Sequence, residues 1–183
     1  AKALGARDTH LLGLWQCHSR EVLIVDGPLG HERPKADGLV TKTRGLALSA
    51  LAADCGPVLL ADPDANVIGA CHAGWRGALS GITDATIDAM ETLGAKRSNI
   101  HAVLGPCISA PAYEVGPEFR DTFAAEDETY DRFFNQDPGS STGRPHFDLK
   151  RFILMRLRRA GLTHIEALPD CTYSQPGGYF SYR

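Results

Sequence analysis

The sequence lacks long apolar runs and has no marked excess of charge of one sign. No apolar run approaches the roughly 18 residues that a membrane-spanning helix needs, and residues 1–5 lack the apolar core of a secretion signal. The 19 basic and 22 acidic residues are interspersed, and the formal net charge of -3 gives no field that would attract nucleic acid or an anionic membrane. The chain is therefore predicted to be cytoplasmic and to bind small molecules, with its oligomeric state left open.

Paired cysteines are also missing. The chain has five cysteines, an odd number, and none forms a C-x-x-C pair: Cys17, Cys55, Cys71, Cys107 and Cys171. This argues against a disulfide framework and against a zinc ribbon. Free cysteines are most often small buried hydrophobes, and we expect this of Cys17 and Cys71. Cys107 has no histidine or basic residue beside it to activate it, so a packed thiol is the better interpretation there too.

What the sequence does contain is enough for one core. With 183 residues, 43% of them hydrophobic, residues 1–183 are predicted to form a single domain. Apolar runs predict strands at 21–25, 45–50, 57–61, 67–72 and 100–104, and three- to four-residue spacing predicts helices at 79–93 and 148–160. Residues 126–144 are polar and predicted to be a mobile surface loop. Strands mixed with helices predict an α/β layered domain.

Three segments place a potential metal ligand at a strand end. His18, Cys55 and His72 lie in Gln16-Cys17-His18-Ser19, Ala53-Asp54-Cys55-Gly56 and the run that starts at His72. A hairpin of 57–61 and 67–72 would bring Cys55 and His72 roughly abreast. Zinc favours thiolate and imidazole, and a catalytic zinc keeps three protein ligands. The alternative is a set of satisfied core histidines and a buried thiol, because the spacing matches no local zinc pattern and the other five histidines offer equal imidazoles.

The run His72-Ala73-Gly74-Trp75-Arg76-Gly77 precedes the predicted helix at 79–93. Glycines let backbone N–H groups approach a ligand, and a helix N-terminus favours an anion. Arg76 is suited to a bidentate phosphate contact, and Trp75 offers a flat face for a base. The alternative is a tight turn with Trp75 in the core and Arg76 solvated. Residues 105–116, rich in Gly and Pro yet apolar, are suited to wall a pocket.

Taken together, these sequence motifs resemble those of the laccase-domain family. That family was first described as multicopper polyphenol oxidases and later as purine nucleoside phosphorylases, and it includes a peptidoglycan editing factor. The resemblance covers most of the chain in ordered motifs: Gln16-Cys17-His18, Ala36-Asp37-Gly38-Leu39-Val40-Thr41, Ala53-Asp54-Cys55, His72-Ala73-Gly74-Trp75-Arg76-Gly77, Gly105-Pro106-Cys107-Ile108, Tyr113-Glu114-Val115-Gly116, Cys171-Thr172-Tyr173 and Phe180-Ser181-Tyr182-Arg183.

The resemblance implies a three-layer α/β/α sandwich with a mixed sheet and one zinc bound by His18, Cys55 and His72. It implies phosphorolysis of adenosine, inosine, guanosine and methylthioadenosine, with adenosine deamination as a side activity. Cys55, His72 and Arg76 are then the candidate catalytic residues, with Trp75, Arg76 and Gly77 binding substrate and phosphate. Either Asp54 or Glu114 would protonate the leaving purine.

Two features depart from the family pattern. Relatives carry several dozen residues before the Gln-x-His motif and a short tail after the Ser-Tyr-Arg motif, so the chain is expected to lack N-terminal and C-terminal segments. Gly56 is also smaller than the residue expected after the cysteine ligand, which would loosen the turn that aims the Cys55 thiolate.

Other functions remain open at this point. Cys55 as nucleophile with His72 as base would give a cysteine hydrolase or deamidase. A copper-dependent polyphenol oxidase is a third interpretation, since copper outcompetes zinc for such ligands, although none of the seven histidines forms the His-x-His pair of multicopper oxidases. A zinc-stabilised module that binds nucleosides or cell-wall fragments without turning them over is the non-enzymatic alternative.

Overall fold

The computed structural model describes residues 7, 10–30, 33–136 and 142–183, and these contain ten strands and four α-helices. The strands are β1 (Leu11–Leu12), β2 (Val22–Ile24), β3 (Gly38–Thr41), β4 (Ala47–Leu48), β5 (Gly56–Asp62), β6 (Val67–Ala73), β7 (His101–Leu104), β8 (Phe134–Gln136), β9 (Pro145–Phe147) and β10 (His164–Ala167). The helices are α1 (Trp75–Ser80), α2 (Ile82–Thr92), α3 (Pro117–Glu126) and α4 (Leu149–Arg159), with 3₁₀ turns η3 (Arg97–Asn99), η4 (Ala110–Ala112) and η5 (Glu128–Phe133).

The central sheet has six strands in the order β10-β7-β5-β6-β3-β2. The two outer pairs, β10 with β7 and β2 with β3, run parallel, whereas β5 pairs antiparallel with both β6 and β7, and β6 pairs antiparallel with β3. The predicted α/β class and the mixed sheet are therefore confirmed.

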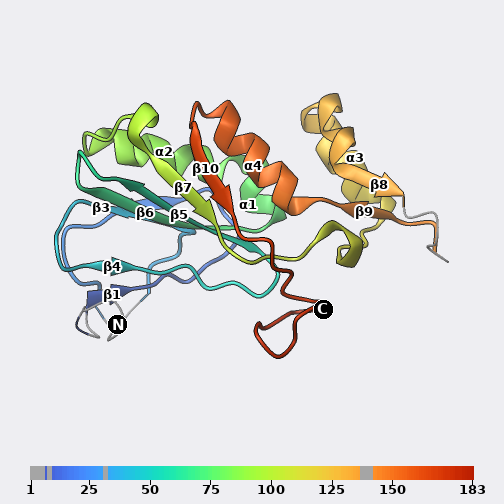
Figure 1. Cartoon of the computed structure of the whole chain (residues 1–183), viewed down its shortest axis with the longest axis horizontal. Coiled ribbons are helices and arrows are strands. Elements are labelled where there is room, and N and C mark those ends of the chain that lie inside the picture. The colour runs from blue at the N-terminus through green and yellow to red at the C-terminus, as the bar shows by residue number, and fades with distance from the viewer. Residues whose placement is uncertain (1–6, 8–9, 31–32, 137–141) are drawn as a thin grey trace.

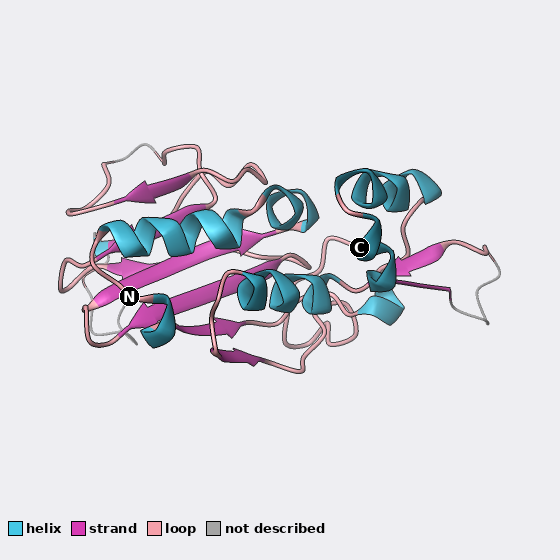
Figure 2. Cartoon of the chain, turned by 90° about the horizontal axis from the view of Figure 1, so that it is seen from above, coloured by secondary structure: helices cyan, strands magenta, loops and turns pink. Residues whose placement is uncertain are grey.

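The two faces of the sheet are covered differently (Figures 1 and 2). Helices α1, α2 and α4 lie over one face, while β1 and β4 lie across the other. On that second face an apolar cluster packs beneath β1 and β4, with Leu12, Leu14, Leu39 and Leu46 among its buried members. In the described residues this second face is covered by a short strand pair. The reason is local: residues 10–14 and 46–49 are short apolar segments that pair with each other in parallel.

The hairpin of β5 and β6 forms as predicted and sets the geometry of the site. The buried Asp62 carboxylate accepts hydrogen bonds from the backbone N–H groups of Asp64 and Ala65, which closes the turn. The register pairs Gly56 with Ala73 and Pro57 with His72. Residue 55 and residue 72 consequently lie abreast at the end of the hairpin.

The helix predicted at 79–93 is in fact two helices. Gly81 adopts a left-handed conformation with a φ of +96°, ends α1 by donating its N–H to the Gly77 carbonyl, and precedes α2. Helix α1 begins earlier than predicted, at Trp75, because Gly74 supplies its extended N-cap. Trp75, Arg76 and Gly77 therefore lie inside a helix and not in the loop before it.

The remaining sequence expectations have mixed outcomes. Helix α4 matches its prediction, with Asp148 capping it by accepting from the Arg151 N–H. The strand expected at 45–50 is reduced to the two residues of β4. The surface loop expected at 126–144 is wrong for 128–136, which form η5 and β8, because Tyr130 and Phe133 are buried against the core; residues 137–141 lie outside the described residues. None of the described helices has the length and apolarity needed to cross a membrane.

An aromatic cluster joins α3 and β9 to α4, and Phe123 is at its centre. The Phe123 side chain is fully buried, and its ring centroid lies 4.6 Å from that of Phe147 and 5.1 Å from that of Phe152. Because stacked, tilted and edge-on rings surround Phe123, no neighbour can easily fill the volume that a truncation would leave.

We expect Phe123→Ala to lower the free energy of unfolding by about 3–5 kcal/mol, through lost burial and the cavity left behind. Phe180→Ala is the matched control, since Phe180 is 87% exposed, and its effect should stay within about 0.5 kcal/mol. Urea unfolding followed by circular dichroism measures both. Equal effects of the two variants would contradict the assignment of Phe123 to the core.

Candidate metal centre and adjoining hollow

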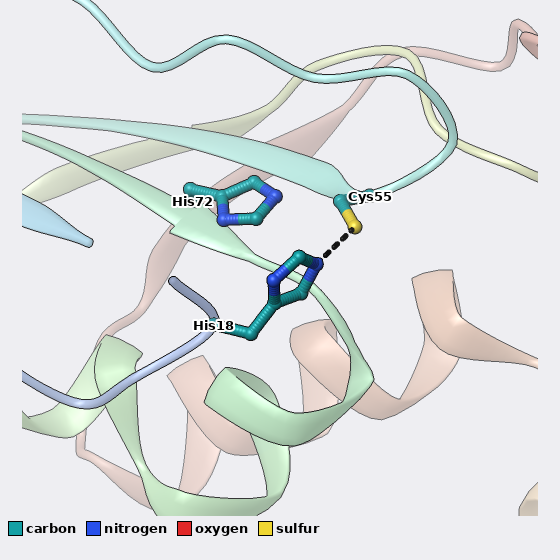
Figure 3. Close-up of side chains that lie close together, drawn as sticks. All are labelled: His18, Cys55 and His72. Atoms are coloured by element: carbon teal, nitrogen blue, oxygen red, sulfur yellow. Dashed lines mark hydrogen bonds between the residues drawn. The ribbon is translucent and has the colours of Figure 1, made fainter. Parts of the chain in front are cut away.

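His18, Cys55 and His72 converge at the end of the β5–β6 hairpin (Figure 3). Cys55 directly precedes β5, His72 lies in β6, and His18 lies in the loop before β2. One ligand atom from each residue lies within 4.8 Å of the other two. The structure therefore brings together the three residues that the sequence singled out as ligands. In the described part of the chain it is the one group of three such side chains.

The spacing of the donor atoms suits a single ion. The Cys55 Sγ lies 3.6 Å from the His18 Nε2. A tetrahedral zinc with bonds of about 2.3 Å to sulfur and about 2.0 Å to nitrogen separates two such donors by roughly 3.6 Å. A side chain at Gly74 would put its Cβ 2.6 Å from the His18 ring and 2.8 Å from the Cys55 sulfur. Gly74 is thus needed for these two ligands to approach each other.

His72 is held in the orientation that a metal ligand requires. Its Nδ1 lies 2.8 Å from an oxygen of the buried Asp37 carboxylate. Because an ionised carboxylate can only accept, Nδ1 carries the proton and Nε2 keeps its lone pair. Burial lowers the pKa of His72 and so favours the neutral ring. The hydrogen bond with Asp37 raises this pKa, but its effect is smaller than that of burial.

The same Asp37 carboxylate fixes the loop that carries His18. The backbone N–H groups of Cys17, His18 and Ser19 donate to it at 3.1, 3.0 and 2.7 Å, and the Ser19 hydroxyl donates at 2.8 Å. His18 has a φ of +61°, an uncommon conformation for a non-glycine residue that these bonds maintain. Asp37 therefore positions two of the three ligands.

Asp37 lies in one of the motifs that resemble the family, but the sequence alone does not indicate its role. Burial opposes its ionisation, yet the hydrogen bonds from His72, Ser19 and Cys17 outweigh burial and lower its pKa to about 2. Its partners lie 18 to 35 residues away in sequence. The one signal available from sequence was an aspartate beside a glycine at the start of an apolar strand.

Cys55 is not activated as a nucleophile by its surroundings. Burial, with the nearby Asp54 and Asp37 carboxylates, raises the pKa of its thiol to about 11. Its thiol contacts His18, whereas His72 is hydrogen-bonded to Asp37. This environment stabilises a thiolate only in the presence of a cation, which suits a metal ligand better than the Cys55–His72 pair of a cysteine hydrolase.

Asp54 ties the C-terminal segment to the ligand loop. Its buried carboxylate accepts from the hydroxyls of Thr172 and Ser181 at 2.8 and 2.9 Å and from the backbone N–H groups of Tyr182 and Arg183 at 2.8 and 3.3 Å. Both of its oxygens are thus occupied by donors within the protein. Of the two acids considered for protonating a purine, Asp54 has the structural role and Glu114 is the more accessible.

A hollow of about 330 Å³ lies near the ligand group, lined by Trp75, Tyr113, Glu114, Val115, Gly116, Phe119, Arg144 and Arg183. Residues 105–116 supply one side of it, so the prediction that this segment walls a pocket is confirmed. Burial, together with Cys55, raises the pKa of Tyr113 to about 12. The hollow combines three aromatic residues, one carboxylate and two guanidinium groups.

The structure places the residues expected to bind substrate as follows. Trp75 is half-buried, packs against Phe119 at 4.6 Å between ring centroids, and lines the hollow. The Arg76 side chain is exposed and its guanidinium lies over the Trp75 ring, 5.1 Å from the centroid. Gly77 is buried with its α-carbon against the Ser19 carbonyl, where a Cβ would lie 3.1 Å from that oxygen. Arg76 is the more accessible of the two residues expected to bind phosphate.

The other thiols and imidazoles are not members of this group, although the Cys17 thiol lies 3.6 Å from the Asp37 carboxylate. Cys107 and Cys71 are fully buried, and burial raises the pKa of each thiol to about 12. The prediction of packed thiols is confirmed for these two, whereas Cys17 is exposed. His101 and His164 stack on each other across β7 and β10, with ring centroids 4.5 Å apart.

Fold and site together define an α/β protein with one candidate three-ligand metal centre, in its described part, at the end of a hairpin. The chain belongs to the family described as multi-copper polyphenol oxidoreductase laccase, whose model matches residues 1–183. Curated relatives in this family carry the name purine nucleoside phosphorylase, which supports an enzyme of that type.

Two relatives and two solved structures illustrate the likeness. Purine nucleoside phosphorylase ORF3 of Streptomyces griseus is 42% identical over 186 residues, covering 100% of this chain and 72% of the relative. A purine nucleoside phosphorylase of Rickettsia prowazekii is 37% identical, with 94% of this chain and 70% of the relative covered. The hypothetical protein YfiH of Bacillus licheniformis superposes with a TM-score of 0.86 at 28% identity, over 100% of this chain and 72% of the other. The protein NMB0706 of Neisseria meningitidis does so at 0.83 and 32%, over 99% and 71%.

We expect Asp37→Asn to weaken zinc binding roughly 10- to 100-fold, because the amide removes the charge that orients His72 and leaves N–H groups of the His18 loop without an acceptor. Competition with a chromophoric chelator measures the affinity. Asp26→Asn, at an exposed position, is the control and should bind like the wild type. Unchanged affinity in Asp37→Asn would show that the ligands orient themselves without this carboxylate.

Proposed function

We propose that this chain is a zinc-dependent purine nucleoside phosphorylase that acts on adenosine, inosine, guanosine and methylthioadenosine. The observation that carries the proposal is the His18, Cys55 and His72 group beside a hollow with aromatic and cationic walls. Relatives named for this activity match almost the whole chain. An aromatic surface suits a purine, and guanidinium groups suit a phosphate.

The proposed reaction breaks one bond and forms one. A phosphate oxygen forms a bond to the anomeric carbon of the ribose while the glycosidic carbon–nitrogen bond breaks. The electron pair of that bond goes to the purine, which takes up a proton, and the products are the free base and ribose 1-phosphate. His18, Cys55 and His72 would hold a zinc ion, which would supply Lewis-acid chemistry at this place.

The chain's own residues have distinct proposed roles. Trp75 and Tyr113 line the hollow and offer flat surfaces to the base. The sequence suggested Arg76 and the backbone of Gly77 as phosphate contacts. Both residues lie in α1, and Arg76 lies over Trp75 outside the lining of the hollow, so the phosphate is not assigned to them. Glu114 is half-buried in the wall of the hollow and is the better placed of the two candidate acids, because the Asp54 carboxylate already accepts four hydrogen bonds.

Adenosine deamination is proposed as a side activity of the same site. Water replaces the exocyclic amino group on the purine ring and ammonia leaves, so inosine accumulates without any need for phosphate. The two activities are therefore separable in one assay by leaving phosphate out.

Oxidation of phenols fits the site less well. In the described residues the structure holds one group of three ligands, whereas a multicopper oxidase needs several coppers and many more histidines. Copper can occupy the His18, Cys55 and His72 ligands in place of zinc, since it binds such ligands more tightly. The copper-dependent activity would then be incidental to the phosphorylase.

We expect Cys55→Ser to lose both the metal and the phosphate-dependent release of base from adenosine and inosine, because a hydroxyl is a poor ligand for zinc beside two imidazoles. Elemental analysis of the purified protein should give one zinc per chain for the wild type. Asp26→Asn is the control, since Asp26 is exposed and outside the ligand group, and it should keep metal and activity.

Two results would contradict the proposal. Full phosphate-dependent turnover by metal-free Cys55→Ser would remove the metal from the reaction. Zinc-loaded wild-type protein that releases no base, with or without phosphate, would favour a zinc-stabilised binding module. Rapid inactivation of the zinc-loaded protein by iodoacetamide at Cys55 would instead favour the cysteine hydrolase, because a zinc-bound thiolate is protected from the reagent.

A further inference from the structure

We propose that Arg183 and Arg144 form the anion subsite of the hollow and bind the phosphate co-substrate between them. Both guanidinium groups line the hollow, whereas Arg76 lies outside its lining. This inference deepens the proposed phosphorylase function and rests on it. It assigns phosphate to two residues that lie 39 positions apart in sequence and far from the glycine-rich turn.

The position of Arg183 is fixed by a buried carboxylate. Its backbone N–H and that of Tyr182 donate to Asp54. The Ser181 hydroxyl donates to Asp54 and accepts a hydrogen bond from the Arg183 N–H at 3.2 Å. The Arg183 guanidinium lies over the ring of Tyr113, 4.9 Å from its centroid. An exposed arginine is normally free to sample many rotamers, and here the main chain and an aromatic ring restrict it.

Arg144 faces the hollow from the segment that leads into β9. Its ion pair with Glu114 is long, with Nη1 3.9 Å from the carboxylate, and 60% of the Arg144 side chain is exposed. Glu114 is engaged more closely by the Thr142 hydroxyl, at 2.7 Å. Because the contact with Glu114 is long and solvated, Arg144 can turn to a phosphate at little cost.

The charges around the hollow favour an anion. Two guanidinium groups and one carboxylate line it, and arginine matches the oxygen geometry of phosphate with paired N–H donors. The neighbouring ligand group has the opposite character, since Asp37, Asp54 and the Cys55 thiol surround it. A phosphate dianion is therefore favoured on the arginine side of the site.

The hollow is close enough to the ligand group for both to act on one substrate. Gly74 touches the His18 ring and the Cys55 sulfur, and the next residue, Trp75, lines the hollow. The Arg183 guanidinium packs over Tyr113 in the same lining. A nucleoside that contacts Trp75 and Tyr113 would therefore lie next to Arg183 and one residue along the chain from Gly74, which adjoins the ligand group.

The test compares three single variants of the zinc-loaded protein: Arg183→Gln, Arg144→Gln and Arg76→Gln. Calorimetric titration with inorganic phosphate alone gives the affinity, and steady-state kinetics give KM for phosphate and for inosine separately. We expect Arg183→Gln and Arg144→Gln each to weaken phosphate binding and raise its KM roughly tenfold, as loss of a charge-assisted contact does, with little change in KM for inosine. Arg183→Lys should fall between, since it keeps the charge and loses the paired donors.

Arg158→Gln is the control, because Arg158 is an exposed arginine on α4 outside the lining of the hollow. Three results would overturn the assignment. They are wild-type phosphate affinity in both Arg183→Gln and Arg144→Gln, a loss of affinity confined to Arg76→Gln, and no phosphate binding by the wild type. Phosphate-dependent turnover with an unchanged KM in the two variants would remove the subsite and leave the phosphorylase function standing. Phosphate binding that depends on the two arginines, without any base release, would support the subsite and contradict the phosphorylase function.

Discussion

A single buried carboxylate, Asp37, determines whether the metal centre exists as a site. It accepts hydrogen bonds from three consecutive backbone N–H groups, from the Ser19 hydroxyl and from His72. These donors come from a loop and from a strand that are otherwise not joined by any ladder contact at this point. Because an unpaired buried carboxylate is costly, the loop that carries His18 and the ring of His72 are held in place by the same free energy that keeps Asp37 ionised.

Asp54 positions residues of the hollow by accepting hydrogen bonds, as Asp37 positions the metal ligands. It adjoins Cys55 in sequence, has a φ of +86°, and gathers the C-terminal segment through Thr172, Ser181 and two backbone N–H groups. A strained backbone at this position is tolerated because four donors satisfy the side chain. Asp54 therefore positions both the Cys55 ligand and Arg183 in the wall of the hollow. A substitution in the C-terminal segment would for this reason shift the position of the Cys55 thiol.

Sequence patterns predicted the local parts of this arrangement and not the long-range ones. The hairpin, its register near His72, and helix α4 follow from apolar periodicity and turn residues, which depend on near neighbours. The break at Gly81 was missed because an isolated glycine is also tolerated within a helix. The roles of Asp37, Arg144 and Arg183 depend on partners up to 129 residues distant, for which neither spacing nor composition carries a signal. The ligand trio itself became a firm prediction through family resemblance, since spacing alone did not separate His18 and His72 from the other five histidines.

The distribution of charge explains why the metal group and the anion subsite should be separate places. Around the trio lie two ionised carboxylates and a thiol whose pKa is raised to about 11 partly by them. Such a setting favours a cation and disfavours a phosphate, because like charges at short range in a partly buried site are weakly screened. The two arginines in the lining of the hollow carry the opposite charge. Under the proposed function, the metal and the phosphate are therefore bound by separate groups of residues with opposite charge.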